Sequence, residues 1–384
     1  MKIAIVHDWL VTYGGAERVL AQMLLCFPQA DVFAVIDGLA LKDRTFLNGK
    51  KVNTTVLQNL PGVFKHYRKL LPLMPWAMAR LNLSQYDVVI SSSHAVAKGV
   101  HLRSNQLHIC LCYSPMRYAW DLQEAYLQEA NLDKGIKGMA ARWLLKKLQQ
   151  WDFETSKRVH HFIAISNYIA QRIERCYGRS SVVVYPPVNV LGFPLKSKPD
   201  ENFYLTASRL VPYKNVALMV ATFNSLPGYK FKVIGDGPEF NKIQAMAGPN
   251  VEILGHTSFD VLKDHLQRAK AFVFAADEDF GIAPIEAQAC GTPVIAFGKG
   301  GLLETVQEGE NPTGYFFAEQ STDSLKQAIL AFESMSFKPE DCRDNALKYS
   351  ESIFRQNFTH TVMSFVNNFP QTSTQTPQKA AVPS

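Results

Sequence analysis

Short apolar runs rich in β-branched residues alternate with helical patterns along the first half of the chain. A helix is expected over 16–26, between the first two of these runs. Such alternation is typical of a parallel sheet that is covered by helices. The strands expected in this half lie at 2–9, 30–36, 86–93, 107–114, 160–166 and 180–188.

The same pattern restarts at Asn202, and each apolar run is again followed by a helical or loop segment. The strands expected in this half lie at 202–210, 230–237, 251–257, 269–276 and 292–298. The predicted fold class is therefore α/β, with two doubly wound parallel-sheet units of similar architecture. No repeat at the level of individual residues relates the two halves.

The chain divides into four predicted parts. An N-terminal domain over 1–195 ends in a linker, and a C-terminal domain follows over 196–350. Residues 323–369 have a helical pattern throughout, and we expect their last part, 351–369, to pack back on the N-terminal domain. Residues 370–384 are polar and Pro-rich, which predicts a disordered tail.

The composition fits this organisation and narrows the partners. A chain of 384 residues with 47% hydrophobic and 19% charged residues is typical of a two-domain globular protein. The net charge of +6 is modest, and no nucleic-acid-binding module is recognisable, so a nucleic-acid partner is not expected. The six cysteines include no C-x-x-C pair and are interpreted as reduced, without a metal.

Two stretches suggest contact with a membrane surface. No signal peptide is expected, and no run approaches the roughly 20 apolar residues that span a bilayer. Residues 63–83 and 141–151 interleave basic with aromatic and apolar side chains, which suits an interfacial helix on anionic lipid. A buried helix pair with a solvated edge is the alternative. We expect a cytoplasmic protein, peripheral on the inner face of the cytoplasmic membrane.

Ligands of open α/β sheets gather at the carboxyl ends of the strands. There, residues 277–301 lead from a buried strand through a glycine loop into a short helix, and Glu278 and Glu286 bracket this loop. We expect Glu286 in the first helical turn, where unpaired backbone N–H groups form a natural phosphate site. Ionised carboxylates accept the hydrogen bonds of a vicinal diol, which suits a ribose and a hexose. The alternative is that Glu286 favours the helix dipole and Glu278 is a surface acid.

Cations and glycines at other strand ends extend this pattern. Arg209 and Lys214 follow the strand at 202–210 and could neutralise a leaving diphosphate. Gly14 and Gly15 occupy the first strand-to-helix loop, where a tight turn alone would also require small residues.

With these features in this order, the chain resembles the retaining glycosyltransferases of the GT-B fold, specifically family 4. The resemblance covers about residues 1–369 and implies two Rossmann-like domains that face a cleft. It rests on Gly14-Gly15, Arg209 with Lys214, the spacing Glu278-x7-Glu286, and Gly300-Gly301.

The resemblance implies roles for the donor site. Glu286 would bind the ribose of a nucleotide sugar, and Glu278 would hold the hydroxyls of the donor sugar. The backbone at Phe280, Gly281 and Ile282 would contact the hexose and the diphosphate. Gly14 and Gly15 would let backbone approach the donor phosphate, while Arg209 and Lys214 compensate its charge.

On the other side of the cleft, the stretches around 94 and 113 resemble bacterial mannosyltransferases of O-antigen or exopolysaccharide synthesis. Many relatives have a histidine where Tyr113 stands, so either His94 or the Tyr113 hydroxyl is expected near the reacting carbon. The residues expected on the acceptor side are Tyr13, Met116, Arg117, Tyr118, Trp120 and Asp121.

The implied activity is retaining transfer of mannose from GDP-mannose to a glycan hydroxyl on a polyprenyl pyrophosphate lipid. A UDP-sugar donor is the first alternative, and a nucleotide-sugar-binding scaffold without turnover is the second. No cofactor or metal is implied. Asp277-x-Asp279 superficially matches a D-x-D metal motif, but the cations already expected at the phosphates leave little need for a metal.

Overall fold

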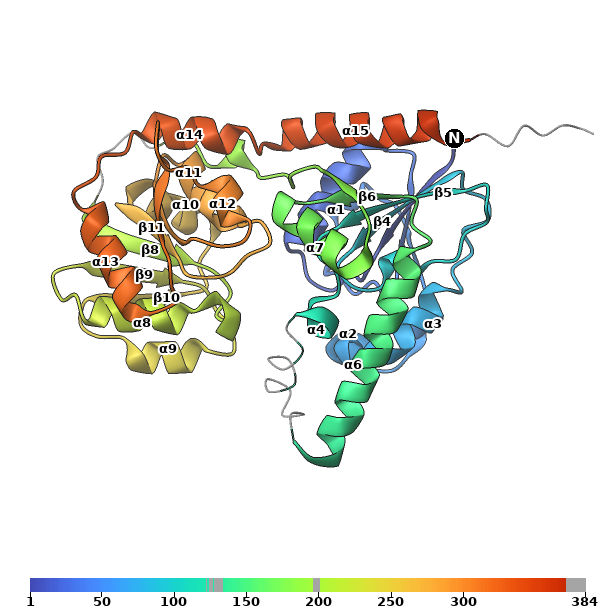
Figure 1. Ribbon diagram of the computed structural model, residues 1–384, viewed down its shortest axis with the longest axis horizontal. Helices are drawn as coiled ribbons and strands as arrows, with labels where there is room; N and C mark the ends of the chain where they lie inside the picture. The colour runs from blue at the N-terminus through green and yellow to red at the C-terminus, as the bar shows by residue number, and fades with distance from the viewer. Residues whose placement is uncertain (122, 124–126, 128–133, 196–200, 371–384) are drawn as a thin grey trace, which may run out of the picture.

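The computed structural model describes residues 1–121, 123, 127, 134–195 and 201–370. Two parallel sheets, each covered by helices, form two lobes that lie side by side (Figure 1). The predicted disordered tail and the last part of the predicted linker fall almost entirely outside the described residues.

The N-terminal sheet has seven parallel strands in the order β3-β2-β1-β4-β5-β6-β7. Its strands are β1 (Ile3–His7), β2 (Asp31–Ala34), β3 (Val52–Thr54), β4 (Val88–Ser93), β5 (Leu107–Cys112), β6 (His161–Ala164) and β7 (Ser181–Val183). Its helices are α1 (Gly15–Cys26), α2 (Val63–His66), α3 (Met74–Met78), α4 (Arg117–Trp120), α6 (Gly135–Ser156) and α7 (Asn167–Tyr177).

The C-terminal sheet has six parallel strands in the order β10-β9-β8-β11-β12-β13. Its strands are β8 (Phe203–Ala207), β9 (Lys230–Ile234), β10 (Val251–Gly255), β11 (Ala271–Phe274), β12 (Val294–Phe297) and β13 (Gly314–Phe317). The helices after the linker are α8 (Val216–Asn224), α9 (Phe240–Met246), α10 (Phe259–Arg268), α11 (Ile282–Ala289), α12 (Leu302–Thr305), α13 (Thr322–Phe332), α14 (Pro339–Leu347) and α15 (Glu351–Asn368).

The fold class is confirmed, with two corrections at the level of elements. Sequence patterns missed the edge strands β3 and β13. Two of the three residues of β3, Asn53 and Thr54, are polar, and β13 begins at Gly314, so neither is a run of β-branched apolar residues. The expected helical run over 323–369 is wrong in detail, because it is three helices. Pro339 begins α14, since a proline is suited to a first helical turn and not to an interior.

Residues 63–83 do not form the single interfacial helix that the pattern suggested. The short helices α2 and α3 flank a 3-10 segment, η4 (Tyr67–Leu73), which contains Pro72. Val63, Met74 and Met78 are buried, whereas the basic side chains lie on the exposed side. Among the described residues, no helix is long and apolar enough to cross a membrane.

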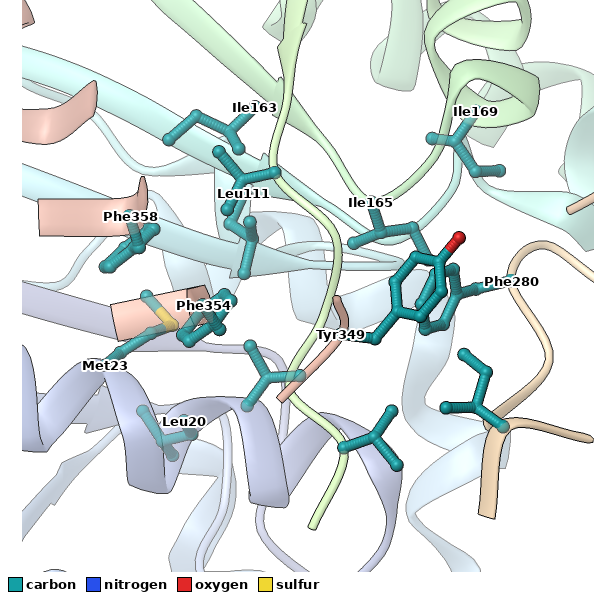
Figure 2. Close-up of a cluster of buried hydrophobic side chains, with 14 of the residues drawn as sticks. Leu20, Met23, Leu111, Ile163, Ile165, Ile169, Phe280, Tyr349, Phe354 and Phe358 are labelled. Carbon is teal, nitrogen blue, oxygen red and sulfur yellow. The ribbon is translucent and has the colours of Figure 1, made fainter. Parts of the chain in front are cut away.

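Helix α15 crosses from the second lobe and lies along the first (Figure 1). Phe354 and Phe358 are fully buried and lie beside Leu20 and Met23 of α1 (Figure 2). Fully burying each such ring contributes about 1.5–3 kcal/mol. The last helix therefore completes the core of the N-terminal domain, although it follows the C-terminal sheet in sequence.

The two lobes share one hydrophobic cluster at their junction. Phe280 stacks on Tyr185 with ring centroids 5.8 Å apart and meets Tyr349 edge-on at 5.5 Å. Figure 2 shows Phe280 and Tyr349 next to Ile165 at the end of β6. The loop that carries Glu278 is thus anchored by an aromatic side chain at the junction between the domains.

Candidate active site

A cavity of about 360 Å³ opens at the carboxyl ends of β8 and β9, next to α11. Arg209, Gly235 and Glu286 contribute to its wall. The complete lining is Ala207, Ser208, Arg209, Ile234, Gly235, Asp236, His256, Thr257, Leu262, Leu266, Phe272, Ala283 and Glu286. A mostly apolar cavity with a few convergent polar groups at this edge of a parallel sheet is suited to a small ligand.

Glu286 is the buried acid of this cavity. Helix α11 begins at Ile282, so Glu286 is its fifth residue and lies in the second helical turn, not in the first as expected. The residue is 7% exposed, and its Oε1 accepts a hydrogen bond of 2.9 Å from Arg18 Nη1. Burial raises the pKa of Glu286, while the Arg18 guanidinium opposes that shift.

Arg18 belongs to α1, so this ion pair joins the two domains. The sequence did not single out Arg18, because its partner Glu286 is 268 positions away. Gly15, at the start of α1, also faces the second domain, since a Cβ built on it would lie 3.4 Å from Ile282 Cδ1. The predicted Gly14-Gly15 loop and the predicted donor loop are therefore neighbours.

Glu278 is paired within its own domain. Its carboxylate forms an ion pair with Lys214, and both side chains are mostly buried. Lys214 ends a short 3-10 turn, η7 (Pro212–Lys214), that follows β8. The predicted pair of acids and the predicted pair of cations, Arg209 and Lys214, thus come together at one end of one sheet.

Gly281 precedes α11 with a φ of 92°, in the left-handed region that favours glycine. A Cβ at this position would lie 3.1 Å from a methyl carbon of Leu302. Both the backbone conformation and the neighbouring side chain therefore explain the glycine, in addition to any close approach of a ligand.

The two aspartates of the D-x-D sequence face cations. Asp277 Oδ2 lies 3.0 Å from Lys299 Nζ, and Asp279 Oδ1 lies 3.0 Å from Arg172 Nη1 of the other domain. Burial raises the pKa of Asp279 to about 6, against the opposing effect of Arg117 and Arg172. These pairs occupy the carboxylates with protein partners, and the expectation of a metal-free site stays a prediction.

A further polar contact joins the domains at α7. The carboxylate of Glu304 accepts hydrogen bonds of 2.8 Å from the backbone N–H groups of Asn167 and Tyr168. Ser166 Oγ donates to the carbonyl of Asp279 at 2.6 Å. An acid at a helix N-terminus is favoured by the unpaired N–H groups there, so α7 is capped by the opposite domain.

Asp8, directly after β1, is the principal site residue that the sequence did not single out. It is fully buried and accepts hydrogen bonds from the backbone N–H groups of His94, Ala95, Val96 and Ala97 at 2.6–3.1 Å. Its Oδ2 also lies 2.9 Å from His94 Nδ1. The sequence feature that could have indicated Asp8 is an acidic residue directly after a buried strand.

This pairing sets the charge of both groups. Burial alone would raise the pKa of Asp8, but the interactions with His94 outweigh it and leave that pKa below its ordinary value. Burial alone would lower the pKa of His94, but the charge of Asp8 and the hydrogen bond to it raise that pKa above 6.5. The His94 side chain is 34% exposed, so a fixed imidazole reaches the surface at the end of β4.

The Tyr113 hydroxyl is held within the domain. It lies 2.9 Å from Ser92 Oγ and donates to the Ala16 carbonyl at 3.2 Å. Ser92 Oγ in turn lies 3.0 Å from His7 Nδ1, and His7 Nε2 lies 3.5 Å from Glu17 Oε1. The Tyr113 hydroxyl is thus held by partners within the domain, whereas the His94 ring is partly exposed.

The residues expected on the acceptor side do not form one surface. Met116 is fully buried, and Trp120 Nε1 donates to the buried Asp152 Oδ2 at 2.9 Å. Tyr118 is half-buried and packs against the core, whereas Tyr13 is exposed beside the cleft loop that contains Gly14. Of these four residues, Tyr13 is thus the one with a largely accessible side chain.

The charged members of that set form ion pairs. Arg117 Nη1 lies 3.4 Å from Asp279 Oδ2, across the junction between the domains. Asp121 pairs with Arg172 Nε at 2.6 Å and with Arg175 Nη2 at 3.0 Å. Arg117 directly, and Asp121 through Arg172, thus connect the N-terminal domain to the loop of the C-terminal domain that contains Asp279.

Two facing parallel-sheet domains with this arrangement of acids and cations define the GT-B class of architecture. Two family models match in tandem: "Glycosyltransferase Family 4" over 13–190 and "Glycosyl transferases group 1" over 191–349. The chain belongs to the family 4 (group 1) glycosyltransferases.

Several curated relatives share part of the chain. An uncharacterized glycosyltransferase of Methanocaldococcus jannaschii is 32% identical over 50% of this chain and 54% of its own length. The O-antigen chain mannosyltransferase RfbU of Salmonella typhimurium is 29% identical over 42% and 47%. A GDP-mannose-dependent phosphatidylinositol monomannoside mannosyltransferase of Mycolicibacterium smegmatis is 27% identical over 43% and 50%. The chain spans about half the length of these relatives.

Solved structures support the fold over almost the whole chain. HepE of Anabaena, in complex with UDP and glucose, has a TM-score of 0.66 at 17% identity and covers 95% of this chain and 100% of its own. Sucrose-phosphate synthase from Thermosynechococcus elongatus has a TM-score of 0.68 at 14% identity, covering 96% and 100%. At such identities the likeness concerns the fold alone.

Proposed function

We propose that this protein is a retaining glycosyltransferase that moves a hexose from a nucleotide sugar to a hydroxyl of a glycan. The observation that carries the proposal is the meeting of Glu278, Glu286, Arg209 and Lys214 at the end of one sheet, beside a cavity of about 360 Å³. Membership of the glycosyltransferase family supports it.

In this proposal the nucleoside occupies the cavity. Glu286 accepts hydrogen bonds from the ribose, and Glu278 accepts them from hydroxyls of the hexose. Arg209 and Lys214 stabilise the charge that develops on the leaving diphosphate, which is where preorganised cations lower a barrier most. The backbone of 280–282 lies against the hexose and diphosphate.

Transfer proceeds without a protein nucleophile, and the leaving diphosphate accepts the proton of the attacking hydroxyl. His94, fixed by Asp8 in the N-terminal domain, donates a hydrogen bond near the reacting carbon. Tyr13 is the first candidate for a stacking contact with the acceptor sugar. The protein then contributes positioning and charge stabilisation, and no metal takes part.

We propose mannose, carried by GDP, as the transferred sugar, and a polyprenyl-pyrophosphate-linked glycan of a surface polysaccharide as the acceptor. The support is the description of relatives as mannosyltransferases of O-antigen chains and of a phosphatidylinositol mannoside. A lipid-linked acceptor requires the enzyme to work at the cytoplasmic face of a membrane, where an anionic surface would attract its exposed basic side chains.

A panel of nucleotides and nucleotide sugars tests the donor. GDP and GDP-mannose are expected to raise the thermal midpoint more than UDP and UDP-sugars do. A ligand present at 100 times its dissociation constant adds about 2.7 kcal/mol to the free energy of unfolding. A larger shift with UDP-sugars would reassign the donor while leaving the class of enzyme intact.

Measurement of donor turnover separates an enzyme from a binding scaffold. The Glu278→Gln variant keeps the size of the side chain but loses the charge, and a hydrogen bond to a charged group is worth about 1.5–3 kcal/mol. We expect kcat/KM for the donor to fall about 10-fold to 150-fold. A scaffold would show no turnover in the native protein either, which would overturn the proposed activity.

A further inference from the structure

Charged side chains of the proposed donor site are paired with one another in the absence of a donor. Each of its two carboxylates has a cationic partner: Glu278 pairs with Lys214, and Glu286 pairs with Arg18 at 2.9 Å. The first pair lies within one domain, whereas the second joins α1 to α11 across the domains. Each cation contacts Oε1 of its carboxylate, so a ligand whose vicinal hydroxyls take both oxygens of an acid would replace the cation there.

The chemistry of a nucleotide sugar matches an exchange of partners. Its ribose and hexose offer hydroxyl donors to the two carboxylates, and its diphosphate offers anionic oxygens to the two cations. The diphosphate is joined to C5′ of the ribose, about one sugar ring away from the 2′ and 3′ hydroxyls that a carboxylate binds, and the long arginine side chain can cover such a span. A cation released from Glu286 is then already close to the diphosphate.

Arg18 has the freedom and the geometry for this exchange. Its side chain is 47% exposed, in contrast to the buried carboxylate that it contacts. A guanidinium presents a planar fork of N–H donors that fits the oxygens of a phosphate. A simple ion pair with one carboxylate oxygen does not need this fork. Leaving Glu286 without a replacement partner would be costly, because buried charges require pairing. Ribose hydroxyls supply that replacement.

We propose that Arg18 is a positioning residue for the donor: it pairs with Glu286 in the empty site and transfers to the diphosphate when a nucleotide sugar binds. This inference rests on the proposed function, because it requires Glu286 to hold the ribose.

A double-mutant cycle tests the exchange. The dissociation constants of GDP and UDP are measured by calorimetry at about pH 8, where a carboxylate is ionised, for the native protein, R18Q, E286Q and the R18Q/E286Q double variant. The diphosphate that binds the native protein more tightly is used throughout. R18Q is expected to weaken its binding about tenfold in the native background, since a charge-assisted hydrogen bond is lost.

The effect of R18Q in E286Q protein shows whether Arg18 contacts the diphosphate or only holds Glu286 in place. If Arg18 transfers to the diphosphate, R18Q weakens binding by a similar or larger factor in E286Q protein, where the guanidinium no longer has to leave an acid. If Arg18 acts only through Glu286, the effect of R18Q disappears in E286Q protein, and the inference is wrong while the proposed function stands. If neither diphosphate binds to the native protein, both the proposed function and the inference about Arg18 are wrong.

Two further variants serve as controls. R18K keeps the charge without the fork and is expected to recover part of the lost affinity. R268Q removes an arginine that pairs with Glu201 and Asp264 on the surface of the C-terminal domain, so it matches the change in net charge. Binding should be unchanged in R268Q, and an equal loss there would attribute the effect of R18Q to net charge alone.

Discussion

At the scale of single residues, the site is organised by buried acids that each hold a partner in place. Asp8 accepts four backbone hydrogen bonds and the contact from His94, so it fixes both the loop after β4 and the imidazole ring. A carboxylate with this many donors remains charged in spite of its burial. Asp8→Asn would disturb the loop and the ring together.

The Asp8–His94 pair predicts a pH-dependent stability. The folded pKa of His94 lies above its ordinary value of 6.5, so its stabilising contribution is complete below about pH 6.5 and is lost as pH rises through the folded pKa. The thermal midpoint of the native protein should therefore exceed that of His94→Gln most at low pH. Thermal unfolding between about pH 5 and pH 9 measures the difference.

His66, an exposed histidine, provides the matched control for this series. His66→Gln should leave the pH profile of the native protein in place. A difference between the native protein and His94→Gln that stays constant over the whole range would contradict the pairing of His94 with Asp8.

At the scale of elements, α6 is the helix with a conspicuous exposed face. Figure 1 shows it extending from the N-terminal domain, with its first turns farthest from the sheet. Ile136 and Trp143 are 83% and 63% exposed, and Met139 between them is exposed as well. The other end is anchored, because the buried Asp152 pairs with Lys98 and accepts a hydrogen bond of 2.6 Å from Tyr177.

The spacing of these apolar residues, with Lys137 and Lys146 exposed on the same helix, suits insertion into an anionic membrane surface. Ile136→Ser with Trp143→Ser should reduce binding to vesicles that contain anionic lipid. Burying each side chain contributes about 1.5 kcal/mol or more, which corresponds to roughly a tenfold loss for each. Sedimentation with vesicles measures the bound fraction.

Leu191→Ser is the control for this experiment, because Leu191 is 80% exposed but belongs to the segment between the domains. It should bind vesicles as the native protein does. Equal binding of the α6 variant and the native protein would exclude α6 as the membrane contact and leave the segment over 63–83 as the alternative.

At the scale of the whole molecule, the two domains are linked by side chains and not only by the chain. Arg18 with Glu286, Arg172 with Asp279, and Glu304 at the start of α7 each connect opposite domains. Helix α15 provides the apolar counterpart, since it is part of the C-terminal sequence but packs in the N-terminal core.

Phe358→Ala tests the contribution of α15. Replacing a buried phenylalanine by alanine costs about 3–5 kcal/mol, so the thermal midpoint should fall by several degrees or more. Ile353→Ala, in the same helix but partly exposed, should have a much smaller effect. Nucleotide binding at low temperature should persist, because no residue of α15 lines the cavity. An unchanged midpoint in Phe358→Ala would contradict the packing of α15 on α1.

The sequence by itself determined most of the elements and the position of the glycine loop between Glu278 and Glu286. Apolar runs of buried parallel strands are local signals, and so are a glycine before a helix and an acid eight positions from another acid. This is why the strands around Glu278 and Glu286 were predicted, while the edge strands β3, with the polar Asn53 and Thr54, and β13, which begins at Gly314, were missed.

Only the tertiary structure decided which of these residues meet. Arg18 and Glu286 are 268 positions apart, and the backbone N–H of His94 is 86 positions from Asp8, so no local pattern connects them. The tertiary structure also shows a difference between two residues that the sequence left as alternatives. The Tyr113 hydroxyl is held within the domain, whereas the His94 ring is partly exposed. Side-chain chemistry can be read along a chain, whereas the pairing of charges depends on distances that exist only after the sheets and helices have packed.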